Sequence, residues 1–259
     1  MNVLDRHLYD QPYPSNVRTG AWGHRGQSHR PEEATSDGQT RAWNGVVRAC
    51  LRIYAAACVP SLSIRRQVPL PAGPKIIALN HANVTDPFLL PSIFPGRICA
   101  LGQANLFDLP VVGRLLALSG NLPVVRGRPD VLLEAAGRQL RRGYSIGVCP
   151  EGRLNHGGPL HRAGVGTVCL ALQSGFPIVP VGFYVPARYA RVIRANVGGR
   201  ATFGRWQFGG TCLVEVGQPW WPELEARGDH SYRVQRQLTD QLMEQIATLV
   251  RQAEARSDS

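Results

Sequence analysis

The sequence predicts an α/β fold: a single domain with a mixed, largely parallel central sheet flanked by helices, preceded by an N-terminal amphipathic helix. Two observations predict it. From Lys75 onwards, short apolar runs alternate with longer runs of helical period. The helical runs between the apolar ones end in glycine, and one carries arginines in its last turn, as helix C-termini commonly do. The 259 residues, 44% of them hydrophobic, suffice for one sizeable core.

The N-terminal region differs from this domain in composition. Residues 1–40 are rich in Pro, Gly, Ser, His and Arg without a regular period, which predicts an extended or disordered arm. Residues 41–74 are expected to hold an amphipathic helix, over 41–59, and a linker. This helix separates an apolar stripe from its arginines. It either contacts a membrane interface or simply packs on the core, and the sequence leaves both open. The main domain is expected over residues 75–259.

Six apolar runs in the main domain are predicted to be short buried strands, because strands covered on both faces read as continuous apolar stretches. They are residues 75–80, 97–102, 121–125, 145–150, 177–183 and 211–217. Helices are predicted over residues 108–120, 130–143, 164–175 and 231–255. In the last of these helices, the apolar positions Leu238, Leu242, Ile246 and Leu249 mark the face that should be buried.

The formal net charge is +11, and Lys75 is the only lysine, so arginine carries nearly all of the positive charge. Arginine binds phosphate with two hydrogen bonds, and such a surface suits anionic lipid, nucleic acid or phosphorylated small molecules. GC-rich coding equally explains the preference for arginine over lysine, although it does not explain the net charge. A nucleic-acid binder is disfavoured, because the chain lacks interleaved aromatic and basic residues on which bases stack.

Cysteines and termini restrict the expected compartment. The six cysteines form no C-x-x-C pair and lie mostly in apolar runs, which indicates small buried hydrophobes in a reducing compartment. His156 and His161 have no evident third ligand, so no metal site is predicted. No apolar segment follows Met1 closely, and no run reaches about 18 apolar residues. The expected location is the cytoplasmic face of the membrane, as a peripheral protein without signal peptide or transmembrane helix.

Residues that could take part in catalysis or ligand binding follow three of the predicted strands, where ligands gather in sheets of this kind. In the first loop, four residues separate His81 from Asp86. Neutral imidazole takes a proton from an alcohol, and a carboxylate on its other nitrogen fixes the tautomer and stabilises the imidazolium. His81 is therefore the candidate base and Asp86 the candidate orienting group, although a pair at this spacing also arises by chance. No G-x-S-x-G nucleophile elbow is present, which agrees with direct attack by a substrate hydroxyl.

The second and third loops carry candidate phosphate-binding groups. Arg126 precedes Gly127, and a glycine lets the backbone approach a ligand while the guanidinium binds phosphate. In the third loop, Glu151, Gly152 and Arg153 place a carboxylate, a flexible position and a guanidinium side by side. Glu151 is expected to hydrogen-bond an acceptor hydroxyl or to hold an arginine, and Arg153 to bind phosphate.

Taken together, these stretches resemble the glycerolipid (lysophosphatidate-type) acyltransferase family, from about Lys75 to Pro219. The stretches that resemble its four motif blocks, in order, are "NHANVTD", "ANLFDLPVVGRLLALSGNLPVVRG", "CPEGRLNHGGPLHRAGVG" and "PIVPVGF". Two departures matter: Asn83 and Thr85 replace the serine and leucine that are frequent in the first block, and Leu154 stands where the third block commonly has arginine. The His-x4-Asp pair is intact, while the identity of the acceptor is left open.

The resemblance implies an O-acyltransferase with its acyltransferase domain over residues 75–259. Such an enzyme moves a fatty acyl group from acyl-CoA or acyl-ACP to a lysophospholipid hydroxyl, most simply that of 1-acylglycerol-3-phosphate, in phospholipid biosynthesis. It implies no cofactor beyond this acyl donor. The implied partners are the lysophospholipid acceptor, the acyl carrier and an anionic membrane surface, with no nucleic acid. Two alternatives stay open: a non-catalytic peripheral lipid-binding protein on the same fold, and an acyltransferase for another lysolipid such as lyso-ornithine lipid.

Overall fold

The computed structural model describes residues 37–109, 112–125, 127–197 and 200–257. The chain divides into two units, Met1–Thr35 and Ser36–Ser259, and all of the described residues lie in the second. Most of the arm predicted for residues 1–40 therefore lies outside the described residues. The helix predicted over 41–59 is present as α1 (Asp37–Cys58).

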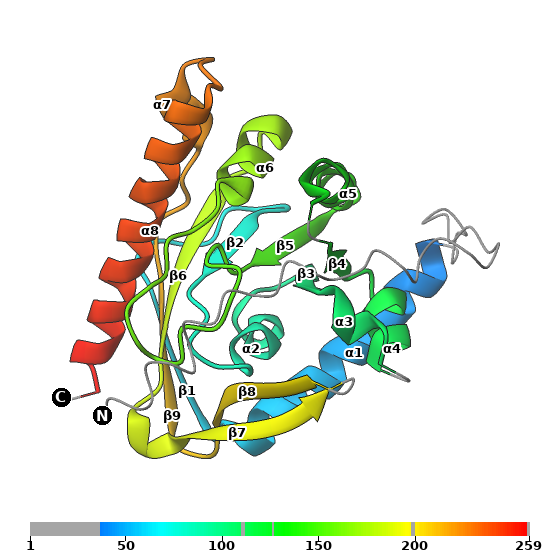
Figure 1. The fold of residues 1–259 in the computed structure, drawn as a ribbon, viewed down its shortest axis with the longest axis vertical. Helices are drawn as coiled ribbons and strands as arrows, with labels where there is room; N and C mark the ends of the chain where they lie inside the picture. The colour runs from blue at the N-terminus through cyan, green and yellow to red at the C-terminus, as the bar shows by residue number, and fades with distance from the viewer. Residues whose placement is uncertain (1–36, 110–111, 126, 198–199, 258–259) are drawn as a thin grey trace. The chain divides into compact units, whose positions relative to one another are not determined.

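A seven-stranded mixed sheet forms the centre of this unit, in the order β1-β9-β6-β2-β5-β3-β4 (Figure 1). Its strands are β1 (Ser61–Arg66), β2 (Ile76–Leu79), β3 (Arg97–Gln103), β4 (Leu122–Val124), β5 (Tyr144–Val148), β6 (Ile178–Tyr184) and β9 (Thr211–Val216). Every neighbouring pair is parallel except β6 with β9, which is antiparallel. The predicted mixed, largely parallel sheet is confirmed, and all six predicted strands belong to it.

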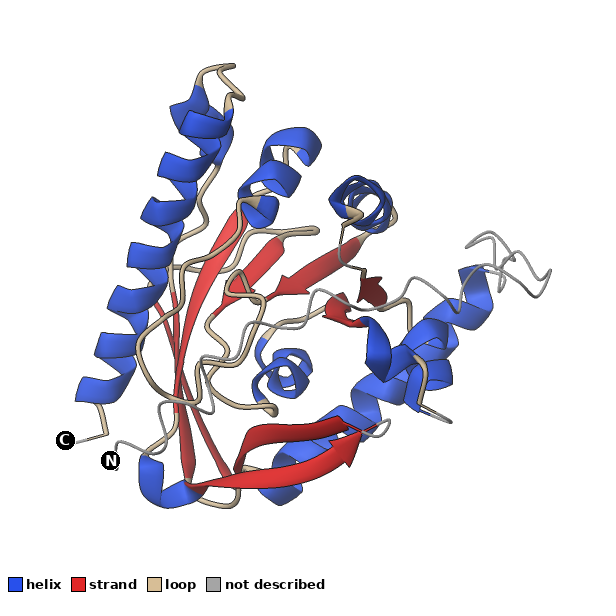
Figure 2. Cartoon of the chain, in the orientation of Figure 1, coloured by secondary structure: helices blue, strands red, loops and turns tan. Residues whose placement is uncertain are grey.

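Helices cover both faces of the sheet, as Figure 2 shows. One face packs on α1 and α2 (Asp86–Ile93), and the other on α5 (Pro129–Arg141), α6 (Gly166–Ser174), α7 (Pro222–Ala226) and α8 (Tyr232–Ala255). Two short helices, α3 (Ala104–Phe107) and α4 (Val112–Leu118), lie between β3 and β4 in the chain, and a 3-10 turn, η2 (Ala187–Tyr189), follows β6. Strand β2 contributes Ile77 and Leu79 to one core and Ile76 and Ala78 to the other, because successive side chains of a strand point to opposite faces.

Helix α8 presents the predicted apolar stripe to the sheet. Leu238, Leu242, Ile246 and Leu249 are at most 3% exposed. The helix passes so close to β6 that a Cβ added to Gly182 would lie 2.5 Å from the backbone carbonyl carbon of Leu249. A glycine is therefore required at this crossing.

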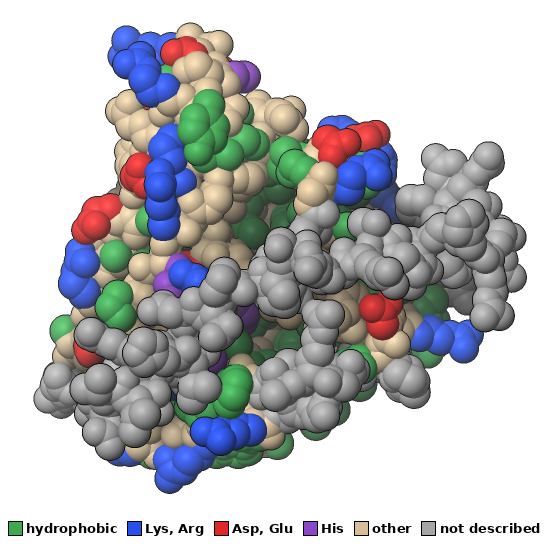
Figure 3. Space-filling model, viewed as in Figure 1, with side chains coloured by type: hydrophobic (Ala, Val, Ile, Leu, Met, Phe, Trp, Pro, Cys, Tyr) green, Lys and Arg blue, Asp and Glu red, His purple; other side chains and the backbone are tan. Residues whose placement is uncertain are grey.

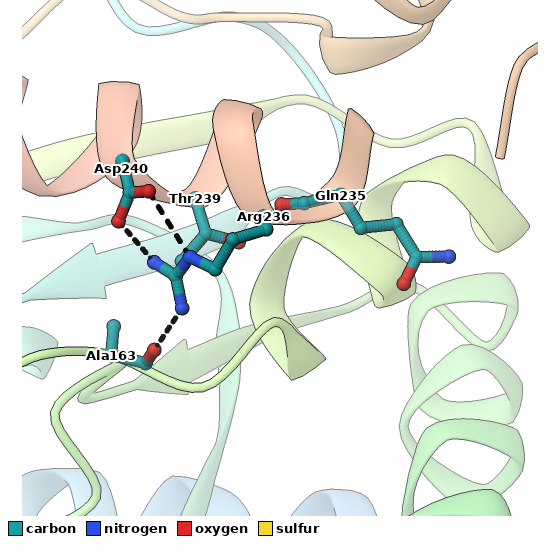
Figure 4. Close-up of polar contacts among 5 residues, drawn as sticks. All are labelled: Ala163, Gln235, Arg236, Thr239 and Asp240. Carbon is teal, nitrogen blue, oxygen red and sulfur yellow. Dashed lines mark hydrogen bonds and ion pairs between the residues drawn. The ribbon is translucent and has the colours of Figure 1, made fainter. Parts of the chain in front are cut away.

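Helix α8 also holds the loop that follows β5. Arg236 donates to the carboxylate of Asp240, at 2.5 and 3.2 Å, and to the backbone carbonyl of Ala163 at 2.5 Å (Figure 4). Ala163 lies near the end of the segment that joins β5 to α6. This contact limits the freedom of the segment that carries Glu151 and Arg153.

The structure adds elements that the sequence pattern did not predict. These are β1, α2, α3, α7, the 3-10 turn η2 and a separate antiparallel hairpin of β7 (Ala190–Val197) and β8 (Arg200–Gln207). The hairpin lies on the same side of the sheet as α1 and α2 (Figure 1). Among the described residues, no helix combines the length and the apolar character needed to cross a bilayer.

Candidate active site

The first and third of the predicted loops meet at one edge of the sheet. Strands β2, β5 and β6 are parallel, so their carboxyl ends point the same way. His81 lies two residues beyond β2, and Glu151 lies three residues beyond β5. Between β2 and His81, the Asn80 side chain accepts from the N–H of Phe183 at 2.8 Å and donates to its carbonyl at 3.0 Å. Asn80 thus fastens the start of the His81 loop to β6.

Glu151 connects three segments of the site. Its buried carboxylate accepts from the backbone N–H of His81 at 2.9 Å, from the backbone N–H of His161 at 2.7 Å, and from the Asn155 amide at 2.9 and 3.1 Å. The backbone N–H of Asn155 donates to the His81 carbonyl at 2.8 Å. Glu151 therefore fixes the backbone that carries His81, and among the described residues no arginine binds its carboxylate. Its contact with an acceptor hydroxyl stays a prediction.

The Asp86 carboxylate is fully buried at the start of α2. It accepts from the Asn83 backbone N–H at 2.7 Å and from the Asn83 side-chain amide at 3.0 Å. Burial raises the pKa of Asp86 to about 7, although the Asn83 donors and the positive charge of Arg205 act in the opposite direction. The carboxyl group is thus poised to change charge near neutral pH.

The His81 side chain is half-buried, and burial lowers its pKa to about 4, with a smaller contribution from the charge of His156. The imidazole is therefore neutral at physiological pH, which is the form that accepts a proton. Its Nδ1 atom is shielded from solvent and has no hydrogen-bond partner in the described structure. A buried polar atom without a partner needs an explanation, and a catalytic role is one that fits a histidine at this position.

One expectation from the sequence is corrected here. A hydrogen bond between Asp86 and His81 was expected, and the described structure does not contain it. The reason is local: both oxygens of Asp86 accept from Asn83, three residues earlier, and close the turn between β2 and α2. Asp86 shapes the turn that follows His81, while its catalytic role stays a prediction.

Arg205 is the site residue that sequence reasoning missed. It lies on β8, and its buried guanidinium donates to the Asn83 side-chain oxygen at 2.7 Å and to the Val185 carbonyl at 2.9 Å. The backbone carbonyl of Arg205 accepts a hydrogen bond from the Val84 N–H at 2.9 Å. Burial lowers the pKa of Arg205, and the charge of Asp86 partly offsets this effect. No sequence signal marked Arg205, which is 122 residues from Asn83 and in no motif.

The loop after β5 bends tightly next to Arg205. His156 and Gly157 both have positive φ angles, of 55° and 79°, and the Asn155 side chain accepts from the Gly157 N–H at 2.9 Å. A Cβ on Gly157 would lie 3.1 Å from the guanidinium carbon of Arg205. Glycine at this position therefore lets the loop pass directly over the arginine.

The remaining predicted residues differ in how well they are placed. Arg153 is exposed, and its guanidinium lies 3.3 Å from the His161 ring nitrogen Nδ1. Gly152 and Gly127 are exposed and have positive φ angles, of 66° and 79°. Arg126 lies outside the described residues. Among the residues that are described, no group of three or more His, Cys, Asp or Glu is placed to hold a metal ion.

A protein-family model described as Acyltransferase matches residues 61–184, from the start of β1 to the end of β6. This stretch contains every site residue predicted from the sequence. The family match and the relatives below support the glycerolipid acyltransferase family that the four motif blocks predicted.

Within this family, the chain is similar to 1-acyl-sn-glycerol-3-phosphate acyltransferases. It is 27% identical to that of Borreliella burgdorferi over 144 residues, which cover 54% of this chain and 57% of that protein. It is 31% identical to the human 1-acyl-sn-glycerol-3-phosphate acyltransferase beta over 114 residues, which cover 42% of this chain and 41% of that protein. The matches thus span about half the length of these curated relatives.

A solved structure shows the same fold over most of the chain. It is the 1-acyl-sn-glycerophosphate (LPA) acyltransferase PlsC from Thermotoga maritima, with a TM-score of 0.59 and 17% sequence identity. The match covers 89% of this chain and 86% of that chain. The shared fold therefore extends well beyond the segment that the family model matches.

Proposed function

We propose that this protein transfers a fatty acyl group from an acyl thioester, carried by coenzyme A or acyl carrier protein, to a hydroxyl of a lysophospholipid. The most direct acceptor is 1-acylglycerol-3-phosphate, since the relatives named above carry this substrate in their names. The observation that carries the proposal is the neutral imidazole of His81, whose backbone is fixed by Glu151 at the carboxyl ends of the parallel strands β2 and β5.

The chemistry follows from that imidazole. His81 takes the proton of the acceptor hydroxyl while the oxygen attacks the thioester carbonyl. The tetrahedral intermediate collapses with cleavage of the carbon–sulfur bond, and His81 returns the proton to the leaving thiolate. The products are a new oxygen ester and one thiol, so no oxidant, metal or water is consumed. Asp86, when ionised, stabilises the cationic imidazolium that exists between the two proton transfers.

The acceptor's phosphate would bind to the arginines of the second and third loops. Arg126 and Arg153 supply the guanidinium groups, Gly127 and Gly152 the backbone approach, and Glu151 the anchored loop between them. The net charge of +11, together with α1, would hold the protein on an anionic membrane surface, where acceptor and product reside.

A product assay tests this function. The purified protein is incubated with labelled acyl-CoA or acyl-ACP and a panel of lysolipids, including lyso-ornithine lipid, and the products are identified by mass spectrometry. We expect phosphatidate and one equivalent of free thiol with lysophosphatidate, and loss of both in His81→Ala. Arg126→Ala should mainly raise the KM for the acceptor. Binding of lysolipids without any thioester consumption would instead identify a non-catalytic lipid-binding protein.

A further inference from the structure

The β7–β8 hairpin is the most strongly basic segment of the chain. Residues 187–207 contain five arginines and no aspartate or glutamate. On β7, the run Arg191, Val192, Ile193 and Arg194 is exposed throughout, and the two apolar side chains retain 53% and 39% of their accessible surface. Figure 3 shows basic side chains beside hydrophobic ones at the lower edge of the view, where the hairpin lies.

The charges of this strand are not neutralised within the described part of the protein. The Arg191 guanidinium donates only to the backbone carbonyls of Arg188 and Ala190, at 3.2 and 3.0 Å. The Arg194 guanidinium lies over the Phe203 ring, 5.4 Å from its centroid. Neither forms an ion pair with a described carboxylate. Because successive side chains of a strand point to opposite faces, Arg191 shares one face of the hairpin with Ile193, and Arg194 shares the other with Val192. Each face of β7 thus pairs a guanidinium with an apolar side chain, a combination that suits a lipid headgroup layer, where phosphates lie just above the first methylenes.

The opposite edge of the hairpin is bound to the candidate active site. On strand β8, the Arg205 carbonyl accepts a hydrogen bond from the Val84 N–H, and the Arg205 guanidinium donates to the Asn83 side chain. Neighbouring strands lie about 4.8 Å apart, so β7 and the His81 loop flank β8 at roughly one strand spacing each. A bilayer in contact with β7 would therefore lie close to the loop that bears the base.

We propose that the exposed strand β7, at the outer edge of the hairpin, is a docking surface for an anionic lipid bilayer and that it brings the His81 loop to the membrane surface. This inference rests on the proposed function, because it supplies the route by which a membrane-resident lysolipid reaches the base. The groove between α1 and α2 is less suited to this task. Its Arg48 already donates to the backbone carbonyls of Gly96 and Pro91, where it joins the two helices.

The test measures vesicle binding, which needs no catalysis. The full chain is sedimented with vesicles of phosphatidylcholine alone or with 30% phosphatidylglycerol, as wild type and as R191Q/R194Q. Each basic residue near an anionic surface contributes about fivefold in affinity, so we expect the double variant to bind the anionic vesicles about 25-fold more weakly. V192S/I193S should weaken binding at low and at high salt, because salt screens only the charges. R141Q/R233Q, which removes two exposed arginines from α5 and α8, should bind like the wild type.

A second measurement separates this inference from the proposed function. Turnover of a short-chain lysophosphatidate dissolved below its micelle concentration should be unchanged in R191Q/R194Q and reduced only when the acceptor is presented in vesicles. If the wild type is inactive with the acceptor both in solution and in vesicles, the proposed function fails while the vesicle-binding result still stands. Wild-type vesicle binding by R191Q/R194Q would overturn the docking surface. If R191Q/R194Q in addition no longer bound acyl carrier protein, which is acidic, the hairpin would be a protein interface instead.

Discussion

The Arg205 guanidinium lies 2.7 Å from the side-chain oxygen of Asn83 and so joins the β7–β8 hairpin to the turn between His81 and Asp86. Asn83 in turn donates twice to the Asp86 carboxylate. The three residues form a chain of hydrogen bonds from the hairpin to the start of α2. His81 lies on the same turn, so its placement depends on a residue more than a hundred positions away.

We therefore expect Arg205→Gln to reduce turnover by up to about 100-fold, because a small displacement of a catalytic group is sufficient for that loss. The KM for the acyl donor should change little, since Arg205 has no direct contact with the thioester in this mechanism. The measurement is steady-state kinetics of the folded variant. Arg233→Gln, an exposed arginine on α8, is the matched control.

The pH profile distinguishes this positioning role from a simple loss of stability. Arg205 lowers the pKa of Asp86 through its charge, so removing that charge should raise the pKa of Asp86 further. The acid limb of kcat/KM should then move to higher pH in Arg205→Gln, and return towards the wild-type position in Arg205→Lys. An unchanged limb in both variants would mean that Arg205 acts on the fold alone.

Replacing Glu151 by its amide analogue should reduce both stability and turnover. All four of its hydrogen bonds need acceptor oxygens, and Glu151→Gln replaces one oxygen with an amide that cannot accept. We expect a loss of about 1–3 kcal/mol in the free energy of unfolding, because a buried donor is left unpaired, and a fall in turnover. Amide hydrogen exchange at His81 and His161 should accelerate. Glu134→Gln breaks only an exposed pair on α5 and should leave both properties unchanged, in chemical denaturation and in assay.

The crossing of α8 over β6 gives a prediction about stability alone. Gly182→Ala places a Cβ 2.5 Å from the backbone of Leu249, and neither the strand nor the helix can move without disturbing the core. We expect a loss of about 1–3 kcal/mol in the free energy of unfolding. Gly166→Ala, at a position with open space at the start of α6, is the control and should be neutral or slightly stabilising. Equal stability of the two variants in denaturant titrations would contradict the close approach.

The sequence predicted the elements whose patterns are locally complete. Most of the apolar strands were found because burial on both faces leaves a continuous apolar run, and α8 because its stripe of Leu and Ile has a helical period. Strand β4 was predicted to be buried, but it is mostly exposed at the edge of the sheet. The hairpin was missed because β7 carries exposed side chains in succession and shows no alternation of apolar and polar residues. Strand β1 was missed for a similar reason, since it is only partly buried at the edge of the sheet.

In the candidate site too, the sequence predicted what a local pattern marks and missed what depends on tertiary contacts. His81 and Glu151 were found because each directly follows a buried strand. The contact of Asp86 with Asn83 instead of His81, and the arrival of Arg205 from β8, depend on a turn and on tertiary packing. Neither leaves a local pattern, so sequence reasoning identified the residues of the first loop but not the interactions that hold them.

His81 and Asp86 give the last prediction, since burial shifts their pKa values in opposite directions. The pKa of His81 is lowered to about 4 and that of Asp86 raised to about 7. If the ionised carboxylate is needed to stabilise the imidazolium, kcat/KM should fall as pH drops through about 7. In Asp86→Asn that limb should disappear and leave a lower plateau extending down to about pH 4, where His81 becomes protonated. A limb near 6.5 in Asp86→Asn would show that the histidine is not desolvated.

The same shifts predict opposite effects on stability, through the protons bound by the folded and unfolded states. Folded Asp86 holds its proton more tightly than the unfolded chain does, so this residue reduces the free energy of unfolding as pH rises from about 4 to 7. Folded His81 binds its proton more weakly, so this residue increases the free energy of unfolding as pH rises from about 4 to 6.5. In the wild type the two trends oppose each other. Denaturant titrations from pH 4 to 7 should therefore show stability rising with pH in Asp86→Asn and falling in His81→Ala, relative to the wild type. Parallel curves for all three proteins would exclude both buried titrations.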